Sequence, residues 1–266
     1  MALNAQPVKS PSFTPTATSA VGFELAPLAS AGAAVITTKK CGFAGRAPRD
    51  DGTLGRLQSA ALKFCRDQVS RNKNPYFLEY GCGTGSFSVL LSQAGASVTA
   101  VDQEDNLCDE ARKLCGQGRL TAVIKPAEQI YPNSLAKKMH GVVAEKFLHW
   151  LPHVRGQILL RNTSSTMVPG AKAFISVAGF DCPLANGYPM TKETPLKERY
   201  AAARDGRGKF GHPMTLYTFS EIESLLKMSG LEVLSSWTTD WGLHNFVAIR
   251  NPGGAHRGPV RTPRYG

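Results

Sequence analysis

The hydrophobic and polar residues of the central part of the chain follow two alternating periods. Short apolar runs, typical of buried strands, precede stretches whose apolar residues recur every three or four positions, typical of amphipathic helices. The pattern predicts strands at 75–80, 97–102, 119–125, 141–147, 171–180, 231–239 and 244–250. It predicts helices at 52–71, 86–95, 105–116, 151–167, 196–204 and 220–230. Ser220 and Glu223 have the spacing of a capping box for the last helix.

Strands that alternate with helices at this spacing predict βαβ units. The fold class is therefore α/β: a doubly wound, mostly parallel sheet of seven strands, covered by helices on both faces. The last two predicted strands follow each other closely, which predicts an antiparallel strand at the sheet edge. In such sheets ligands bind at the carboxyl ends of the strands.

Composition and pattern together divide the chain into three regions. Residues 1–50, rich in Ser, Thr, Pro and Ala, are expected to form a flexible N-terminal tail. The same tail is compatible with a transit or effector secretion signal. Residues 51–250 form the domain. Within it, the polar stretch 181–214 interrupts the alternation of strands and helices, and it is expected to be a lid or a platform for the substrate. Residues 251–266 form a basic C-terminal tail.

Charge and cysteine content restrict the binding partners, metal sites and location that are expected for this chain. A formal net charge of +11 over 266 residues favours acidic partners, whether metabolites, protein surfaces or RNA. The six cysteines include no C-x-x-C pair, so no zinc framework or other metal site is expected. Reduced thiols and a cytoplasmic location are expected instead. No apolar stretch has the length and continuity of a membrane span.

The stretch “FLEYGCGTGSFS” joins the first strand of the domain to the next helix through three glycines: Gly81, Gly83 and Gly85. Glycines at such a junction permit a sharp turn or the close approach of a ligand. A phosphate loop would need a Lys after the glycines, and the dinucleotide fingerprint would need Gly or Ala where Ser86 stands. Glu79 would repel a pyrophosphate, and it suits a ligand that carries positive charge.

A second acid follows the next strand. Asp102 ends “SVTAVD”, about 20 residues beyond the glycines, where an acid can accept the two ribose hydroxyls of an adenosine. The other role open to Asp102 is that of a helix N-cap.

These residues together resemble a known family. The segment “LEYGCGTGSFSVLLSQAGASVTAVD” resembles the first two motifs of class I S-adenosylmethionine (SAM)-dependent methyltransferases. “VIKPAEQIYP”, “GVVAEKFLHWLPH”, “LYTFSEIESLLKMSGLEVL” and “NFVAIR” resemble later segments, so that the resemblance covers about residues 55–250. The H-W-L-P run is similar to that of trans-aconitate and malonyl-carrier-protein methyltransferases, although it recurs across many substrate classes.

The resemblance implies SAM as cofactor, with S-adenosylhomocysteine (SAH) as product. It implies ten cofactor-binding residues: Glu79, Gly81, Cys82, Gly83, Gly85, Asp102, Gln103, Ala127, Glu128 and Glu145. One departure concerns Pro126, which stands where the family often has an Asp that contacts the adenine amino group. Glu128 or a backbone group is expected to substitute, and Ala127 is expected to offer its backbone N–H to the adenine ring.

Methyl transfer from a sulfonium is an in-line displacement, for which the protein must align a nucleophilic O or N and exclude water. A base is needed only where the nucleophile is protonated at the working pH. The candidate catalytic residues are Glu145, His149 and His212. Glu145 could instead orient the amino-acid part of SAM, and His149 could be a packing residue.

The methyl acceptor is expected to be an anionic small molecule, bound beneath the 181–214 insertion. The insertion is basic through six side chains: Lys192, Lys197, Arg199, Arg204, Arg207 and Lys209. Tyr188, Tyr200, Trp241 and His244 are candidate pocket residues. Two alternatives stay open: a protein or RNA methyltransferase, for which RNA binding would be steeply salt-dependent, and a non-catalytic SAM-binding module.

Overall fold

The computed structural model describes residues 53–205 and 212–251, although the side chains of 53–59 and 201–205 are not described. The chain divides into two units, 1–37 and 38–266, and the described part belongs to the second. The predictions for residues 1–50 and for 252–266 therefore fall outside the described residues. Within 53–205 and 212–251, no helix is long and apolar enough to cross a membrane.

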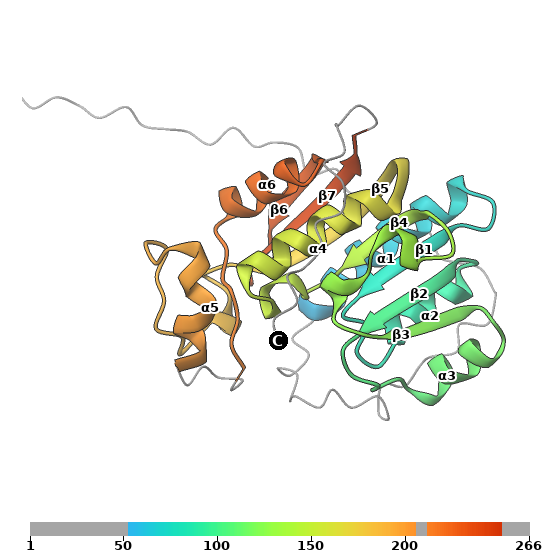
Figure 1. The fold of residues 1–266 in the computed structure, drawn as a ribbon, viewed down its shortest axis with the longest axis horizontal. Helices are drawn as coiled ribbons and strands as arrows, with labels where there is room; N and C mark the ends of the chain where they lie inside the picture. Colours follow the sequence, from blue (N-terminus) through green and yellow to red (C-terminus); the bar gives the residue numbers. More distant parts are fainter. Residues whose placement is uncertain (1–52, 206–211, 252–266) are drawn as a thin grey trace, which may run out of the picture. The chain divides into compact units, whose positions relative to one another are not determined.

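Seven strands form one sheet in the order β3-β2-β1-β4-β5-β7-β6 (Figure 1). Their bounds are β1 Tyr76–Tyr80, β2 Ser97–Asp102, β3 Leu120–Ile124, β4 Met139–Ala144, β5 Met167–Ala178, β6 Leu231–Thr238 and β7 Leu243–Arg250. The first five run parallel, and β7 runs antiparallel to both β5 and the edge strand β6. The predicted α/β class and strand number are confirmed. The strand order reverses between β1 and β4, so the loops after these strands flank the switch point.

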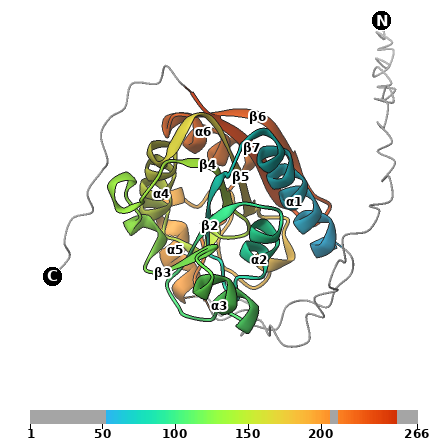
Figure 2. The ribbon, with the colours of Figure 1, turned by 90° about the vertical axis from the view of Figure 1, so that its right-hand side faces the viewer.

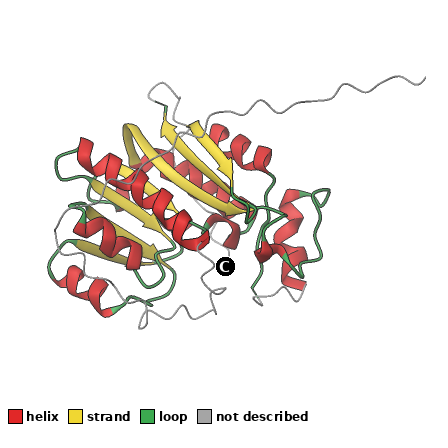
Figure 3. Ribbon diagram, turned by 180° about the vertical axis from the view of Figure 1, so that it is seen from behind, coloured by secondary structure: helices red, strands yellow, loops and turns green. Residues whose placement is uncertain are grey.

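Helices cover both faces of the sheet (Figure 2). On one face lie α1 Thr53–Arg71, α2 Ser86–Gln93 and α3 Asp109–Gly116, and on the other lie α4 His153–Thr166 and α6 Phe219–Met228. Helix α5, Leu196–Asp205, belongs to the insertion and lies on the side to which the strand arrowheads of β1 to β5 point (Figure 3). Short 3₁₀ helices are η1 Ala127–Gln129, η2 Pro132–Ser134, η3 Leu148–Trp150 and η4 Pro183–Ala185.

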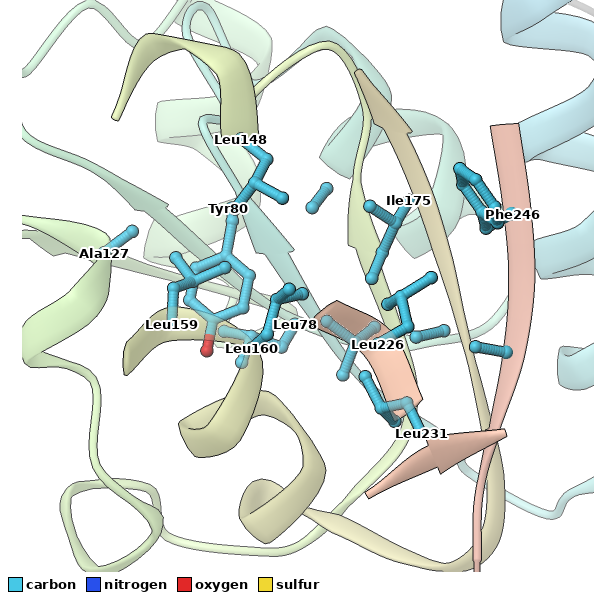
Figure 4. Close-up of a cluster of buried hydrophobic side chains, with 14 of the residues drawn as sticks. Leu78, Tyr80, Ala127, Leu148, Leu159, Leu160, Ile175, Leu226, Leu231 and Phe246 are labelled. Atoms are coloured by element: carbon cyan, nitrogen blue, oxygen red, sulfur yellow. The ribbon is translucent and has the colours of Figure 1, made fainter. Parts of the chain in front are cut away.

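Each face of the sheet has its own apolar core. Phe64 of α1, Leu91 of α2 and Phe174 of β5 belong to the core on the first face. Leu159 of α4 and Leu226 of α6 belong to the larger core on the second face (Figure 4). Because alternate side chains of the parallel strands point into these two cores, the strands read in the sequence as nearly continuous apolar runs.

Several boundaries differ from the sequence prediction, and two of them concern the site and the helix beside it. The capping box of α6 is formed by Thr218 and Glu221, not by Ser220 and Glu223, so the helix begins earlier than predicted. Thr218 is as good an N-cap as Ser, and the Glu221 carboxylate accepts the Thr218 N–H at 2.7 Å. Strand β4 ends at Ala144 rather than at residue 147. The chain leaves the sheet there because Lys146 adopts a left-handed backbone with φ of 51°.

Candidate functional site

The three glycines of the loop between β1 and α2 differ in what a side chain at each position would meet. All three have positive φ, of 69° at Gly81, 51° at Gly83 and 76° at Gly85. A Cβ atom at Gly81 would collide with the ring of Phe147, and one at Gly85 would lie 2.9 Å from both Leu107 and Ala111. A Cβ at Gly83 would meet no atom within 4 Å. The outer two glycines therefore permit internal packing, and Gly83 presents bare backbone to open space.

The Asp102 carboxylate lies against this open glycine. Its Oδ2 accepts the backbone N–H of Gly83 at 2.8 Å, and its Oδ1 accepts the N–H of Glu104 at 3.2 Å. Each oxygen thus keeps acceptor capacity for a ligand hydroxyl. The next helix begins only at Asp109 with Cys108 as N-cap, so Asp102 does not cap it.

Glu79 lies buried beneath the loop, with 6% of its surface exposed. The hydroxyl of Ser88 donates a hydrogen bond to its carboxylate. Burial raises the pKa of Glu79 to about 8, and the nearby charges of Glu145 and Asp102 raise it further against the effect of Ser88. Glu79 therefore lies within electrostatic reach of two further carboxyl groups at the switch point, which favours a cationic ligand.

Glu145 directly follows the end of β4, and its side chain is 11% exposed. Burial raises its pKa, while Lys146 opposes the rise. Its Oε1 lies 3.5 Å from Nζ of Lys146 but has no hydrogen-bond partner. Glu145 is thus a buried carboxyl group with a free acceptor atom, suited to take up a proton or to hold an ammonium group.

The two candidate histidines differ in environment. His149 is fully buried, its Nδ1 accepts the Ala178 N–H at 3.3 Å, and its ring lies 4.9 Å from that of Trp150. Burial, and next the charge of Lys146, lower its pKa to about 3, so that it is neutral at physiological pH. These contacts favour a packing role. His212 is exposed, and its ring meets Trp150 edge-on at 6.5 Å.

The other predicted cofactor residues flank the loop and the end of β3. Cys82 is buried, its N–H donates to the Val101 carbonyl, and burial raises the pKa of its thiol. Gln103 is exposed beside Asp102. Ala127 is buried at the start of η1.

Glu128, the next residue, is turned towards helix α4. Its Oε1 lies 3.3 Å from Arg155, and its backbone carbonyl accepts a hydrogen bond from Asn162 at 3.0 Å. Both partners belong to α4, but the buried Oε2 of Glu128 has no hydrogen-bond partner, so it stays a candidate acceptor for the adenine amino group.

The insertion is anchored by a residue whose role the sequence did not indicate. Arg199 is 1% exposed, and its guanidinium makes hydrogen bonds of 2.6 and 2.8 Å to the Glu221 carboxylate. It also donates to three backbone carbonyls, those of Thr194, Leu216 and Lys192. Its guanidinium carbon lies 4.9 Å above the ring of Phe180. Arg199 is therefore a structural clamp.

The other described cations of the insertion also face acids. Lys192 lies 4.0 Å from Asp181, and Lys197 lies 4.0 Å from Glu198. The side chain of Arg204, and residues 207 and 209, fall outside what the structure describes. The described cations thus give no support to an anion-binding insertion.

The insertion has its own apolar cluster, which packs on the carboxyl ends of the strands. The buried members are Ala178, Cys182, Tyr188, Met190, Met214, Leu216 and Leu243, with Trp150, Phe180, Leu184, Ala185 and Trp241 partly buried against them. The Tyr188 hydroxyl donates to the His212 carbonyl. His244 is also buried, with Nδ1 2.8 Å from the Thr238 hydroxyl. This face of the site is aromatic and rich in methionine.

Comparisons with known proteins agree with this geometry. Residues 55–236 match a family described as “Methyltransferase domain”. Among curated proteins, a ubiquinone biosynthesis O-methyltransferase of Coxiella burnetii (strain RSA 493 / Nine Mile phase I) is 28% identical over 123 residues, which are 46% of this chain and 51% of the relative. The chain thus spans about half the length of the curated relatives it matches.

Solved structures show the same fold. A Burkholderia thailandensis 1,6-didemethyltoxoflavin-N1-methyltransferase, with bound 1,6-didemethyltoxoflavin and S-adenosylhomocysteine, has a TM-score of 0.55 and 18% identity over 76% of this chain and 82% of its own. A SAM-dependent methyltransferase of Clostridium acetobutylicum has a TM-score of 0.56 and 12% identity over 74% and 92%. At such identities the likeness concerns the fold.

The site fits the cofactor of these proteins. The open side of Gly83 leaves room for a ligand, Asp102 keeps acceptor capacity beside it, and the buried Oε1 of Glu145 has no hydrogen-bond partner. A nucleoside with hydroxyl groups and positive charge matches this set of groups. The chain belongs to the methyltransferase-domain family and has the fold of class I SAM-dependent methyltransferases.

Proposed function

We propose that this protein is a SAM-dependent methyltransferase that methylates a hydroxyl oxygen of a small molecule. The observation that carries the proposal is the convergence of Gly83, Asp102 and Glu145 at the switch point of the sheet. When bound there, SAM supplies the methyl group and the sulfur leaving group. The protein's part is to hold cofactor and methyl acceptor in line and to exclude water.

We assign the cofactor contacts as follows. The free acceptor sites of Asp102 take the ribose hydroxyls, and Gly83 allows the backbone to approach the nucleoside. Glu79 and Glu145 supply negative potential for the positive charge of the cofactor. The Ala127 N–H donates to a ring nitrogen of adenine, while Pro126 has no side-chain acceptor for the adenine amino group.

The insertion, residues 181–214, is proposed as the lid over the methyl acceptor. Its side chains Tyr188 and Met190, and Trp150 of η3 packed in the same cluster, favour an apolar or aromatic ring. The name of the Coxiella burnetii relative, an O-methyltransferase of ubiquinone biosynthesis, supports an oxygen nucleophile on a small molecule. The negative charge expected of the acceptor is then the charge of its ionised hydroxyl group. The proposal does not require a separate acidic group bound by the insertion.

Glu145 is the proposed general base. It is the candidate whose carboxyl group has a raised pKa and a free oxygen beside the cofactor loop. His149 is assigned a packing role because it is fully buried and neutral. His212 is exposed at the insertion and is assigned to the rim of the acceptor pocket.

Two other functions remain distinguishable by experiment. A protein or RNA methyltransferase draws support from the net charge of +11. RNA binding would weaken steeply with salt. A non-catalytic module would bind SAM and release no SAH with any acceptor.

The test begins with mass spectrometry of the ligand that co-purifies with the full chain. Calorimetry with SAM, SAH and NAD follows, and binding of NAD without SAM would contradict the proposal. Release of SAH is then measured with a panel of hydroxylated aromatic compounds, an RNA pool and an acidic protein. The proposal expects turnover with members of the first group, and Glu145→Gln is expected to lose it while still binding SAH.

A further inference from the structure

Lys146 occupies a strained position at the cofactor site. It follows Glu145 where β4 leaves the sheet, and its φ of 51° lies in the region that side-chain-bearing residues rarely adopt. Its backbone N–H donates to the Ser176 hydroxyl of β5 at 3.1 Å. The ring of the next residue, Phe147, packs on Gly81 of the glycine loop. The turn that carries Lys146 is thus fixed beside that loop, between the ends of two strands.

The ammonium group of Lys146 is held close to the site by an ion pair with the Glu145 carboxylate. Its side chain is only 25% exposed, and Nζ lies 3.5 Å from Oε1 of Glu145, an atom that has no hydrogen-bond partner. The titratable groups whose pKa responds to its charge are Glu145 and His149, and Glu145 in turn interacts with Glu79. An ammonium group has three N–H donors, and Glu145 is the ion-pair partner of Lys146 among the described residues, so this half-buried cation can still donate to a ligand.

A lysine beside the cofactor site opposes the binding of SAM unless an anion also binds there. SAM brings a sulfonium and an ammonium group, and like charges at short distance in a partly desolvated site repel each other. Glu145 offsets part of this repulsion, but its raised pKa weakens it as a permanent counter-ion. A negative charge that arrives with the methyl acceptor would satisfy both the lysine and the cofactor.

We propose that Lys146 is a catalytic residue that pairs with the ionised hydroxyl oxygen of a phenol-type or enol-type methyl acceptor. The inference rests on the proposed function, methyl transfer at this site. The hydroxyl proton passes to Glu145, and the negative charge on oxygen is held by the Lys146 ammonium. The oxygen then bonds to the methyl carbon while the carbon–sulfur bond breaks and its electron pair stays on sulfur. Glu145 returns its proton to water.

The test uses 4-nitrophenol, whose absorbance reports its ionisation, with the full chain saturated with SAH. Wild-type protein is expected to bind the phenolate form and to lower the apparent pKa of the probe. Lys146→Gln is expected to abolish that shift and to weaken phenolate binding about 10- to 100-fold, the range for a lost charged hydrogen bond. Lys146→Arg keeps the charge and is expected to retain most of the shift. Lys192→Gln, at an exposed lysine of the insertion, is the matched control and should behave as wild type.

The inference is overturned if SAH binds to wild-type protein but 4-nitrophenolate does not. It is also overturned if Lys146→Gln lowers the pKa of the probe as wild type does, or if Lys192→Gln alone abolishes the shift. Circular dichroism and calorimetric SAH affinity of each variant report whether the fold and cofactor site are intact. Failure of wild-type protein to bind SAM or SAH would instead refute the proposed function.

Discussion

The guanidinium of Arg199 and the carboxylate of Glu221 form a two-fold hydrogen-bonded ion pair, at 2.6 and 2.8 Å, between the insertion and the first turn of α6. The Glu221 carboxylate also accepts a hydrogen bond from the Thr218 N–H, so one carboxylate both caps the helix and holds the insertion in place. We expect Arg199→Ala to lower the free energy of unfolding by about 3–5 kcal/mol, because it leaves a half-buried carboxylate without its counter-charge. Urea denaturation measures this loss.

The exposed Lys197 supplies the control for that substitution. Lys197→Ala should change stability by less than about 1 kcal/mol, the usual limit for an exposed pair. The double variant Arg199→Ala/Glu221→Gln should recover part of the loss, since the orphaned charge is removed. A loss below about 1 kcal/mol for Arg199→Ala would show that the clamp does not hold the insertion.

Asp102→Ala should weaken SAM binding by about 1–3 kcal/mol, because the ribose hydroxyls lose a charged hydrogen-bond acceptor. The substitution also removes the acceptor of the hydrogen bond that the Gly83 N–H donates. Calorimetry gives the affinity. Glu104→Ala, whose exposed side chain faces Asn106, is the neighbouring control and should bind SAM normally. Equal affinities of the two variants would place the ribose elsewhere.

Cofactor binding should release a proton from Glu79. Its carboxyl group has a pKa of about 8 in the free protein, so it is mostly protonated at pH 7, and a bound cation favours the ionised form. Calorimetry at pH 7 in two buffers of different ionisation enthalpy should therefore report proton release for wild type and none for Glu79→Gln. Identical release by both proteins would assign the proton to another group.

The same residue predicts a pH dependence of stability. The folded pKa lies above the ordinary 4.5, so folding favours the neutral acid. This contribution is fully present below pH 4.5 and is lost as the pH rises to about 8. Glu79→Gln, which keeps the neutral shape, should flatten the decline in the free energy of unfolding of the cofactor-free protein over that range. A decline as steep as that of wild type would contradict the assignment.

Two glycines of the loop should respond differently to alanine. Gly81→Ala forces a methyl group into the Phe147 ring, and we expect it to destabilise the fold by several kcal/mol. Gly83→Ala meets only the left-handed backbone strain, of about 1 kcal/mol, but its methyl group points into the proposed cofactor space. Thermal unfolding should rank Gly81→Ala as the less stable variant, while Gly83→Ala should lose SAM affinity at nearly normal stability. The reverse ranking would mean that the ligand lies on the other side of the loop.

Local patterns predicted the framework of the site because its parts are close in sequence. The apolar run before Gly81 and the acid at the end of the next strand suffice to place Gly83 and Asp102 at one sheet edge, where a 2.8 Å hydrogen bond joins them. The clamp of Arg199 was not predictable, because the tertiary fold is needed to bring its partners Leu216 and Glu221 to it. The cap of α6 was misplaced by two residues because Thr218 and Ser220 each fit the local rule.

The apolar cluster beneath the insertion shares no side chain with the glycine loop, Asp102 or Glu79. If the insertion holds the methyl acceptor as proposed, substrate range and cofactor use can therefore diverge independently during evolution. Exchange of residues 181–214 between related enzymes that keep an acid at position 221 is then expected to transfer the acceptor preference and to leave SAM affinity unchanged.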